Sequence, residues 1–293
     1  MSTDRRFRSV LRGVALAVLL VSTSCATNTA RTPSAENAIT EAAAKTEQQG
    51  LSITIPGTLA AGFAELQAGV KGKIGLAIMP LGGQQPLTFG NWSTGPAWST
   101  MKIPLTVAAL RRNPGTSTYA ASAAITQSDN TAADTLWQSL GSSQEAAQAV
   151  EAVLREGGDS KTTVPATKTR QDASAFGQAD WALTDQVRFA SRLPCLPQTS
   201  AVTTLMEQVV PAQRWGLGAF AGAEFKGGWG PDLSGAYLVR QFGVMPTQGG
   251  RIAVAFAAQP DSGVFGDGMT LLDRMATLIS QHLTEIPGGN CTA

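Results

Sequence analysis

Histidine is nearly absent from this sequence, and its scarcity excludes several kinds of catalytic site. The 293 residues include a single histidine, His282. A Ser-His-Asp triad, a Cys-His pair or a histidine-ligated zinc site would each depend on that one residue. His282 lies in the amphipathic pattern LLDRMATLISQHL near the C-terminus, where we expect a surface helix. Any catalytic base in this chain is therefore predicted to be another residue type.

Charged residues are also scarce, and neither sign dominates. They make up 15% of the chain, and the formal net charge is +1. Nucleic-acid-binding proteins carry a basic excess that this sequence lacks, so we expect no nucleic-acid partner. The sequence contains no phosphate-binding loop, metal-ligand cluster or dinucleotide fingerprint. We therefore expect neither a cofactor nor a metal.

The N-terminus carries an apolar run, VALAVLLV at residues 14–21, that is too short to span a membrane. Four arginines precede it and the small residues STSCA follow, which is the pattern of a secretory signal. Small residues before Cys25 resemble the lipobox of bacterial lipoproteins, although Ser22 stands where that pattern prefers Leu or Val. We predict a signal peptide over residues 1–24 with Cys25 lipidated. An ordinary export signal with a chance cysteine is the alternative.

The predicted mature chain has two parts. Residues 25–50 are small, polar and poor in aromatics, which indicates a flexible tether, and residues 51–293 are long enough to form a domain with a sizeable core. Cys195 and Cys291 are the two other cysteines, and such a pair in an exported chain predicts a disulfide. We expect the domain on the extracytoplasmic face of the cell membrane, held by the lipid anchor, or secreted.

Strand patterns cluster at the two ends of this domain. Residues 72–81 and 85–91 are apolar or alternating runs joined by a glycine pair, which predicts a hairpin. The later strand patterns lie at residues 224–230, 236–245 and 251–260. Helical patterns occupy residues 100–112, 130–141, 143–158, 184–193 and 267–283. We predict an α+β fold, an α/β sandwich in which a five-stranded antiparallel sheet is built from both chain ends.

The stretch AWSTMKIPL at residues 97–105 places Lys102 three residues after Ser99, at the start of a helical pattern. Residues three apart on a helix are neighbours, so the ammonium would lie beside the hydroxyl. Serine before an apolar helical run commonly caps the helix, and roughly one chance Ser-x-x-Lys is expected in a chain of this length. Alone, the stretch allows either a capping serine or a nucleophile with its base.

Two later motifs favour the nucleophile. SDN stands at residues 128–130, before a helical pattern, and KGG at residues 226–228 lies in the first of the late strand patterns. With the Ser-x-x-Lys pair, they resemble the serine penicillin-recognising family of class A β-lactamases, D-alanyl-D-alanine peptidases and their relatives. The resemblance covers most of residues 70–285 and implies that family's fold. Only 29 residues separate Ser99 from Ser128, which implies a reduced helical domain.

The resemblance implies a role for each polar residue of these motifs. Ser99 would be the nucleophile at a helix N-terminus, and Lys102 would be its base, with a pKa lowered by burial and by the nearby cation Lys226. Ser128 would relay the proton to the leaving nitrogen. Asn130 would hold the substrate amide or fix Lys102, and Lys226 would attract a substrate carboxylate.

Backbone groups and glycines complete the implied site. The N–H groups of Ser99 and Trp229 would form an oxyanion hole, and Gly227 and Gly228 would let substrate lie against their strand. Asp129 would turn inward to fix its loop. Trp229 is expected beside the cleft. The other tryptophans are expected to pack in the core or in loops: Trp92, Trp98, Trp137, Trp181 and Trp215.

Two departures from the family pattern bear on activity. Gly227 replaces the hydroxyl residue that would bind the substrate carboxylate. Class A enzymes place a glutamate about nine residues after the Gly-Asp of their omega loop, where it activates the water that releases the acyl group. Counting from Gly158-Asp159 reaches Lys168, and the next acid, Asp172, is out of register.

Two functions are therefore expected. The first is a penicillin-binding or β-lactamase-like serine hydrolase that forms an acyl-enzyme at Ser99 with a β-lactam or a peptidoglycan-like peptide or amide, and deacylates slowly. The alternative is a catalytically weak or inactive envelope lipoprotein that uses the same cleft for binding.

Overall fold

The computed structural model describes residues 58–115 and 118–291. The predicted signal peptide, the tether and Cys25 lie outside these residues, so export, lipidation and the domain boundaries stay predictions. No helix within the described ranges has the length and apolar character needed to cross a membrane.

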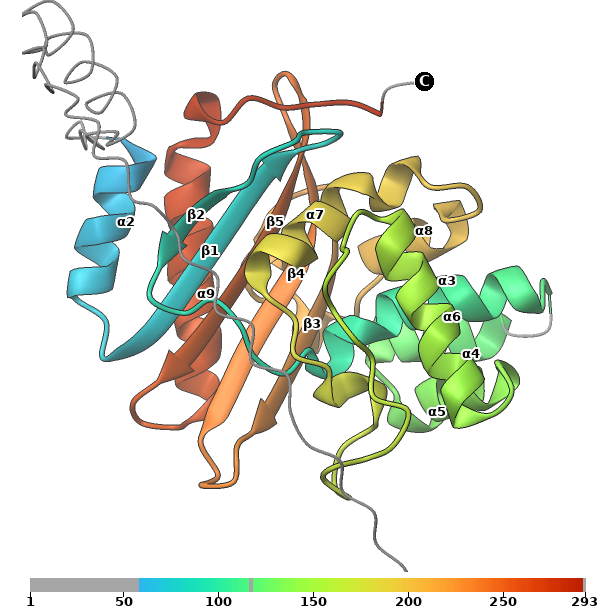
Figure 1. The fold of residues 1–293 in the computed structure, drawn as a ribbon. Helices are drawn as coiled ribbons and strands as arrows, with labels where there is room; N and C mark the ends of the chain where they lie inside the picture. Colours follow the sequence, from blue (N-terminus) through green and yellow to red (C-terminus); the bar gives the residue numbers. More distant parts are fainter. Residues whose placement is uncertain (1–57, 116–117, 292–293) are drawn as a thin grey trace, which may run out of the picture. The chain divides into compact units, whose positions relative to one another are not determined.

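A five-stranded antiparallel sheet organises the described chain, with strand order β2-β1-β5-β4-β3 (Figure 1). Its strands are β1 (Gly72–Pro80), β2 (Leu87–Gly90), β3 (Glu224–Pro231), β4 (Tyr237–Thr247) and β5 (Gly250–Pro260). β1 pairs with β5, so strands from both chain ends share one sheet, and β1 and β2 form the predicted hairpin. The predicted fold class is confirmed, and β3 lies at an edge.

The two faces of the sheet differ in side-chain size. In β5, Ile252, Val254 and Phe256 point toward the core that includes α9 (Phe265–Gln281), beside which α2 (Leu59–Ala68) packs. Alternation sends Ala253, Ala255 and Ala257 to the opposite face. Their small side chains allow α7 (Leu183–Arg192) to pack closely on that face, as Figure 1 shows.

The remaining helices lie on the α7 side of the sheet (Figure 1). They are α3 (Lys102–Arg112), α4 (Thr118–Ser122), α5 (Asn130–Ser139), α6 (Ser143–Glu156) and α8 (Ser200–Glu207). Single-turn helices join them, including η1 (Trp98–Met101), η2 (Ala123–Gln127), η3 (Phe176–Gln178), η4 (Leu193–Cys195) and η6 (Gly216–Ala219). The five predicted helices are present, whereas α2, α4 and α8 were not predicted.

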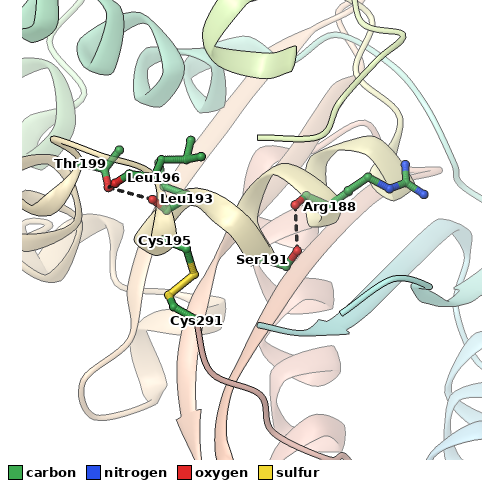
Figure 2. Close-up of a disulfide and its surroundings, with 7 residues drawn as sticks. All are labelled: Arg188, Ser191, Leu193, Cys195, Leu196, Thr199 and Cys291. Carbon is green, nitrogen blue, oxygen red and sulfur yellow. Dashed lines mark hydrogen bonds between the residues drawn. A yellow bond between two sulfur atoms is a disulfide. The ribbon is translucent and has the colours of Figure 1, made fainter. Parts of the chain in front are cut away.

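The predicted disulfide joins Cys195, at the end of η4, to Cys291 in the C-terminal segment (Figure 2). The two Cα atoms are 5.4 Å apart, and the cysteines are separated by 96 positions in the chain. Thr199 fixes the turn around Cys195, because its hydroxyl donates to the carbonyls of Leu193 and Leu196, both at 2.8 Å. The disulfide therefore ties the tail to an already ordered turn.

Candidate active site

Ser99 lies inside η1, the single turn that leads into α3. Met101 occupies the N-cap position of α3 and makes no side-chain capping bond, so Ser99 does not cap this helix, the alternative that the stretch alone allowed. The preceding residue, Trp98, has a φ of 49°, in the left-handed region where a non-glycine residue is strained. The Ser99 hydroxyl has no hydrogen bond to any described residue.

Ser128 lies between two lysine side chains. Lys102 Nζ donates to the Ser128 carbonyl at 2.6 Å and to Asn130 Oδ1 at 2.7 Å, and lies 3.4 Å from Ser128 Oγ. Lys226 Nζ donates to Ser128 Oγ at 2.9 Å and to the Gly227 carbonyl at 2.8 Å. The structure thus brings together four of the predicted site residues. Of the two roles expected for Asn130, its contact with Lys102 is the one observed.

Local backbone geometry explains how Ser128 reaches this position. The chain passes from η2 into Ser128, whose φ of 59° and ψ of 30° are left-handed, and then enters α5. Asp129 begins that helix, because its carboxylate accepts a hydrogen bond from the Ala132 N–H at 2.6 Å. Asp129 is exposed, so the expectation that it turns inward is wrong.

Burial controls the protonation of the two lysines. Lys102 is 1% exposed and Lys226 is fully buried. Desolvation lowers the pKa of Lys102 to about 8, against the attraction of Asp129 and Asp134. Desolvation and the charge on Lys102 lower the pKa of Lys226 well below its ordinary value. The two ammonium groups repel each other, and burial is the larger cause of the lowered pKa at both lysines.

Glycines in β3 allow the edge strand to approach the segment that carries Ser99. A Cβ at Gly228 would lie 2.9 Å from the Ser99 nitrogen and 2.8 Å from the Thr100 nitrogen, and a Cβ at Gly230 would lie 2.6 Å from the Trp98 ring. Only glycine permits these approaches. The expectation that Gly228 leaves room for substrate is therefore corrected. The absence of a side chain at Gly228 leaves room for η1, and the β3 backbone before Trp229 consequently lies close to the backbone of Ser99.

Arg240, on β4, supports the segment that carries Ser99 from within the sheet. It is fully buried, and its guanidinium donates to the carbonyls of Gly95 and Pro96 at 2.8 and 3.0 Å. It also donates to the Trp181 carbonyl at 2.9 Å and to Gln186 Oε1 at 2.8 Å. Burial lowers its pKa to about 9. Sequence reasoning missed this residue, because none of its partners is an acidic side chain that a motif could reveal.

Gln186 extends this network to η1. Its amide nitrogen donates to Thr100 Oγ1 at 3.1 Å, and that hydroxyl donates to the Ala97 carbonyl at 2.5 Å. Arg240 also lies over the Trp92 ring, 5.2 Å from its centroid. Backbone carbonyls at three consecutive positions before Trp98 are therefore hydrogen-bonded to buried side chains, which holds the turn on which Ser99 sits.

The segment between α6 and α7 places no carboxylate at the counted position. Lys168 stands there and is exposed. Asp172 is also exposed and forms an ion pair with Arg170, with 2.6 Å between Nη2 and Oδ2. Arg170 additionally donates to the Pro231 carbonyl at 2.6 Å and lies 5.6 Å from the Trp98 ring centroid. The polar groups of this loop thus contact the loop itself and the end of β3.

Tryptophans contribute more to the surroundings of the site than the sequence indicated. Trp92, Trp137 and Trp181 are buried in the core, as expected. Trp98 lies beside Ser99, and the Trp215 ring lies against Gly227, where a Cβ would be 2.9 Å from Cη2.

His282 ends α9 and contacts the Glu285 carboxylate. The described residues include no group of three or more His, Cys, Asp or Glu side chains that could hold a metal ion.

Comparison with known proteins finds solved structures with a similar fold, but no similar sequence family. No protein-family model matches the chain, and no curated protein sequence matches it. Solved structures that resemble it include the TLA-3 extended-spectrum β-lactamase, at 13% identity and a TM-score of 0.63, covering 77% of this chain and 98% of that one. A class A β-lactamase from Mycobacterium abscessus is 19% identical with a TM-score of 0.61, covering 76% and 98%.

A third structure is that of the class A β-lactamase of the last common ancestor of Gram-negative bacteria, at 18% identity and a TM-score of 0.59. It covers 76% of this chain and 98% of that one. At these identities the likeness concerns the fold. The five-stranded antiparallel sheet and its helices therefore have the α+β fold of the class A β-lactamases.

Proposed function

We propose that this protein is a serine hydrolase that forms an acyl-enzyme at Ser99 with a β-lactam or a peptidoglycan-like amide. The observation that carries the proposal is the Ser128 hydroxyl, hydrogen-bonded by one buried lysine and close to a second that begins the helix after Ser99. Burying an ammonium group without a charged partner costs stability and favours the neutral amine, and a lysine with a lowered pKa can act as a base near neutral pH.

The proposed step begins with Lys102 in its neutral form. Ser99 Oγ attacks the carbonyl carbon, and its proton passes to the Lys102 amine. Ser128, which both lysines approach, gives its hydroxyl proton to the leaving nitrogen as the carbon–nitrogen bond breaks, and the Lys102 ammonium passes the proton taken from Ser99 to the Ser128 oxygen. The N–H groups of Ser99 and Trp229 stabilise the negative oxygen. The product is an ester between Ser99 and the acyl group.

Release of that ester is proposed to be slow. The loop between α6 and α7 has Lys168 at the position counted for a water-activating glutamate, and Asp172 is engaged with Arg170. An ammonium group has no lone pair with which to take a proton from water, and a carboxylate paired with an arginine is a weak base. The protein would then accumulate as an acyl-enzyme instead of turning over rapidly.

The test is intact-mass measurement of the full chain after incubation with a fluorescent penicillin and, separately, with a thioester acyl donor. We expect one adduct, mapped to Ser99 by peptide sequencing and lost in Ser99→Ala. Ser143→Ala is the matched control, because Ser143 is an exposed serine at the start of α6. An adduct that survives in Ser99→Ala, or no adduct with either donor, contradicts the proposal.

A second candidate function is reversible binding without chemistry. The observation that favours it is the Ser99 hydroxyl, which makes no hydrogen bond with Lys102 among the described contacts. Under this alternative the same ligands would protect the protein against thermal unfolding without adding covalent mass. Ser99→Ala would then bind as tightly as the wild type.

We further propose that the domain is exported and attached to the extracytoplasmic face of the membrane through a lipid on Cys25, as the basic N-terminus, short apolar run and small residues support. Radioactive palmitate labelling in cells tests this. Label should be incorporated into the wild type and be absent from Cys25→Ala. Equal labelling of both would contradict lipidation at this residue.

A further inference from the structure

Three buried side chains from three elements form one chain of hydrogen bonds that ends beside Ser99. Arg240 lies on β4, Gln186 on α7 and Thr100 in η1, and each is fully buried. Arg240 Nη2 donates to Gln186 Oε1 at 2.8 Å, and Gln186 Nε2 donates to Thr100 Oγ1 at 3.1 Å. The Thr100 hydroxyl donates in turn to the Ala97 carbonyl at 2.5 Å. The chain of bonds thus connects the sheet to the turn that carries Ser99.

Arg240 fixes the direction of every donor in this chain of bonds. A guanidinium has donors and no acceptor, so the amide oxygen of Gln186 must face Arg240 and the amide nitrogen must face Thr100. The Thr100 hydroxyl then accepts from that nitrogen, and its one proton is left for the Ala97 carbonyl. The amide of Gln186 therefore keeps Thr100 as a donor to Ala97.

The Ala97 carbonyl closes the turn on which Ser99 sits. It accepts the Thr100 N–H at 3.2 Å as well as the Thr100 hydroxyl, so two bonds span Trp98 and Ser99. Trp98 has a φ of 49°, and a non-glycine residue persists in that region only where the surrounding structure holds it. Without the hydroxyl bond, this strained turn would keep one of its two closing bonds.

We propose that Gln186 is a positioning residue for the acylation of Ser99, because its amide keeps the Thr100 hydroxyl on Ala97 and so holds the turn in its reactive shape. This inference rests on the proposed function. Gln186 acts through Thr100 and not on the acyl donor. A displacement of a nucleophile by about 1 Å can slow a reaction about 10²-fold, so holding the turn contributes to the rate.

Gln186→Glu separates positioning from support of the fold. Its carboxylate gives Arg240 a charged partner in place of a neutral one, so the free energy of unfolding should not fall. An ionised carboxylate has no donor, so the Thr100 hydroxyl must donate to it and releases Ala97. We expect the maximal acylation rate to fall about tenfold to 100-fold. The half-saturating donor concentration and the pH midpoint of the rate should not change.

Thr100→Val removes the same hydroxyl without adding a charge. It should slow acylation as much as Gln186→Glu does, and the double variant should be no slower than either, because both changes break one bond to Ala97. Thr203→Val, on α8, is the matched control. Thr203 is also buried, and its hydroxyl donates to the Ser200 carbonyl at 3.2 Å. This control should lose some stability and react like the wild type.

The measurements use the full chain and an uncharged thioester whose released thiol is detected by absorbance, called here the neutral thioester. In the reaction the bond from Ser99 Oγ to the carbonyl carbon forms, the carbon–sulfur bond breaks, and the serine proton ends on the departing thiol. Thiol release at several donor concentrations gives the maximal rate and the half-saturating concentration. Intact mass gives the adduct, and urea unfolding gives the stability of each variant.

Three results would overturn the inference. Gln186→Glu and Thr100→Val could both react as fast as the wild type at saturating donor. Thr203→Val could be slowed as much as Thr100→Val, which would assign the loss to general destabilisation. The rate loss in Gln186→Glu could come only from a higher half-saturating concentration, which would place Gln186 in donor binding.

Failure of the proposed function gives a different result. A wild type that forms no Ser99 adduct contradicts the proposed function and the inference with it. A wild type that is acylated at Ser99, with variants that match it, overturns the inference alone. The two failures are therefore distinguishable.

Discussion

The cluster around Ser128 and the loop at residues 157–182 both adjoin the segment that carries Ser99, yet their polar groups are used differently. In the cluster, two buried ammonium groups approach one serine hydroxyl. In the loop, Gln178 accepts from the Arg170 N–H at 2.8 Å and donates to the Ala173 carbonyl at 3.2 Å. In the cluster, the lysine nitrogens lie near the Ser128 hydroxyl, whereas in the loop the Gln178 amide bonds to backbone groups of the loop itself. Under the proposed function, the groups that would form an acyl-enzyme are present, whereas Lys168 stands at the loop position counted for a glutamate.

Removing the base should produce the largest effect and test the cluster directly. Lys102→Ala deletes the proposed proton acceptor for Ser99 and should slow adduct formation by about 10²–10⁴-fold, the usual contribution of a general base. Time-resolved intact-mass measurement with the neutral thioester gives the rate. Lys168→Ala, an exposed lysine in the loop, is the control and should react like the wild type. Equal rates for both variants would remove Lys102 from the mechanism.

Two arginine substitutions should show that the buried network of Arg240, which holds the segment before Ser99, supports the fold more strongly than the loop does. Arg240→Met removes the donor from three oxygen acceptors, the carbonyls of Pro96 and Trp181 and Gln186 Oε1, and should lower the free energy of unfolding by about 3 kcal/mol. Arg170→Met removes a solvent-screened pair with Asp172 and should change stability little. Urea unfolding measures both. An Arg170→Met protein that is as destabilised as Arg240→Met would show that the loop supports the fold as strongly as the buried network.

The pH dependence should identify the lysine charge that controls the cluster. Acylation needs neutral Lys102, whose pKa burial lowers to about 8, so the rate should rise with pH and level off above that value. Below it, each pH unit should cost roughly tenfold. A rate that is constant across this range would contradict a lysine base.

The same lowered pKa has a consequence for stability. The folded chain binds fewer protons than the unfolded chain between about 8 and the ordinary lysine value of 10.5. The contribution of this group to the free energy of unfolding therefore increases with pH in that window. Comparing urea unfolding of the wild type and Lys102→Met as a function of pH isolates the contribution.

The smallest effect is expected from placing an acid at the counted loop position. Lys168 lines a cavity with Asp134, Trp137 and Phe176, and Ser99 is not among the residues that line it. Lys168→Glu should therefore leave the decay rate of the acyl-enzyme unchanged. A marked acceleration of decay would show that the loop can present a carboxylate to the ester. In that case a single side chain, at position 168, would account for the slow release.

Local hydrophobic patterns predicted all five strands of the sheet and five of the helices. Alternation in β5, with large residues toward α9 and alanines toward α7, made the strand recognisable from sequence. The short helices α4 and α8 carry too few turns for a clear apolar period, and α2 has only two buried residues, so none was predicted. The three motifs led to the prediction that Lys226 lies near Lys102, and in the structure both lysines approach Ser128.

Contacts that depend on backbone carbonyls or on ring placement could not be predicted in this way. Arg240 binds the carbonyls of Gly95, Pro96 and Trp181, and carbonyls leave no trace in residue identity. Trp215 fills the space over Gly227 because the segment around η6 folds back onto β3, a long-range approach that no local period encodes. From the sequence, Gly227 could be recognised only as a glycine in place of the family's hydroxyl-bearing residue.

The most direct test of the account is the lifetime of the acyl-enzyme. Wild-type full chain is acylated with the neutral thioester, excess donor is removed, and intact mass is followed at neutral pH. The account predicts a Ser99 adduct that persists far longer than the time needed to form it. An adduct that decays as fast as it forms would contradict the account. If Asp134→Asn then prolonged its lifetime, the water-activating base would lie on α5, where Asp134 already attracts Lys102.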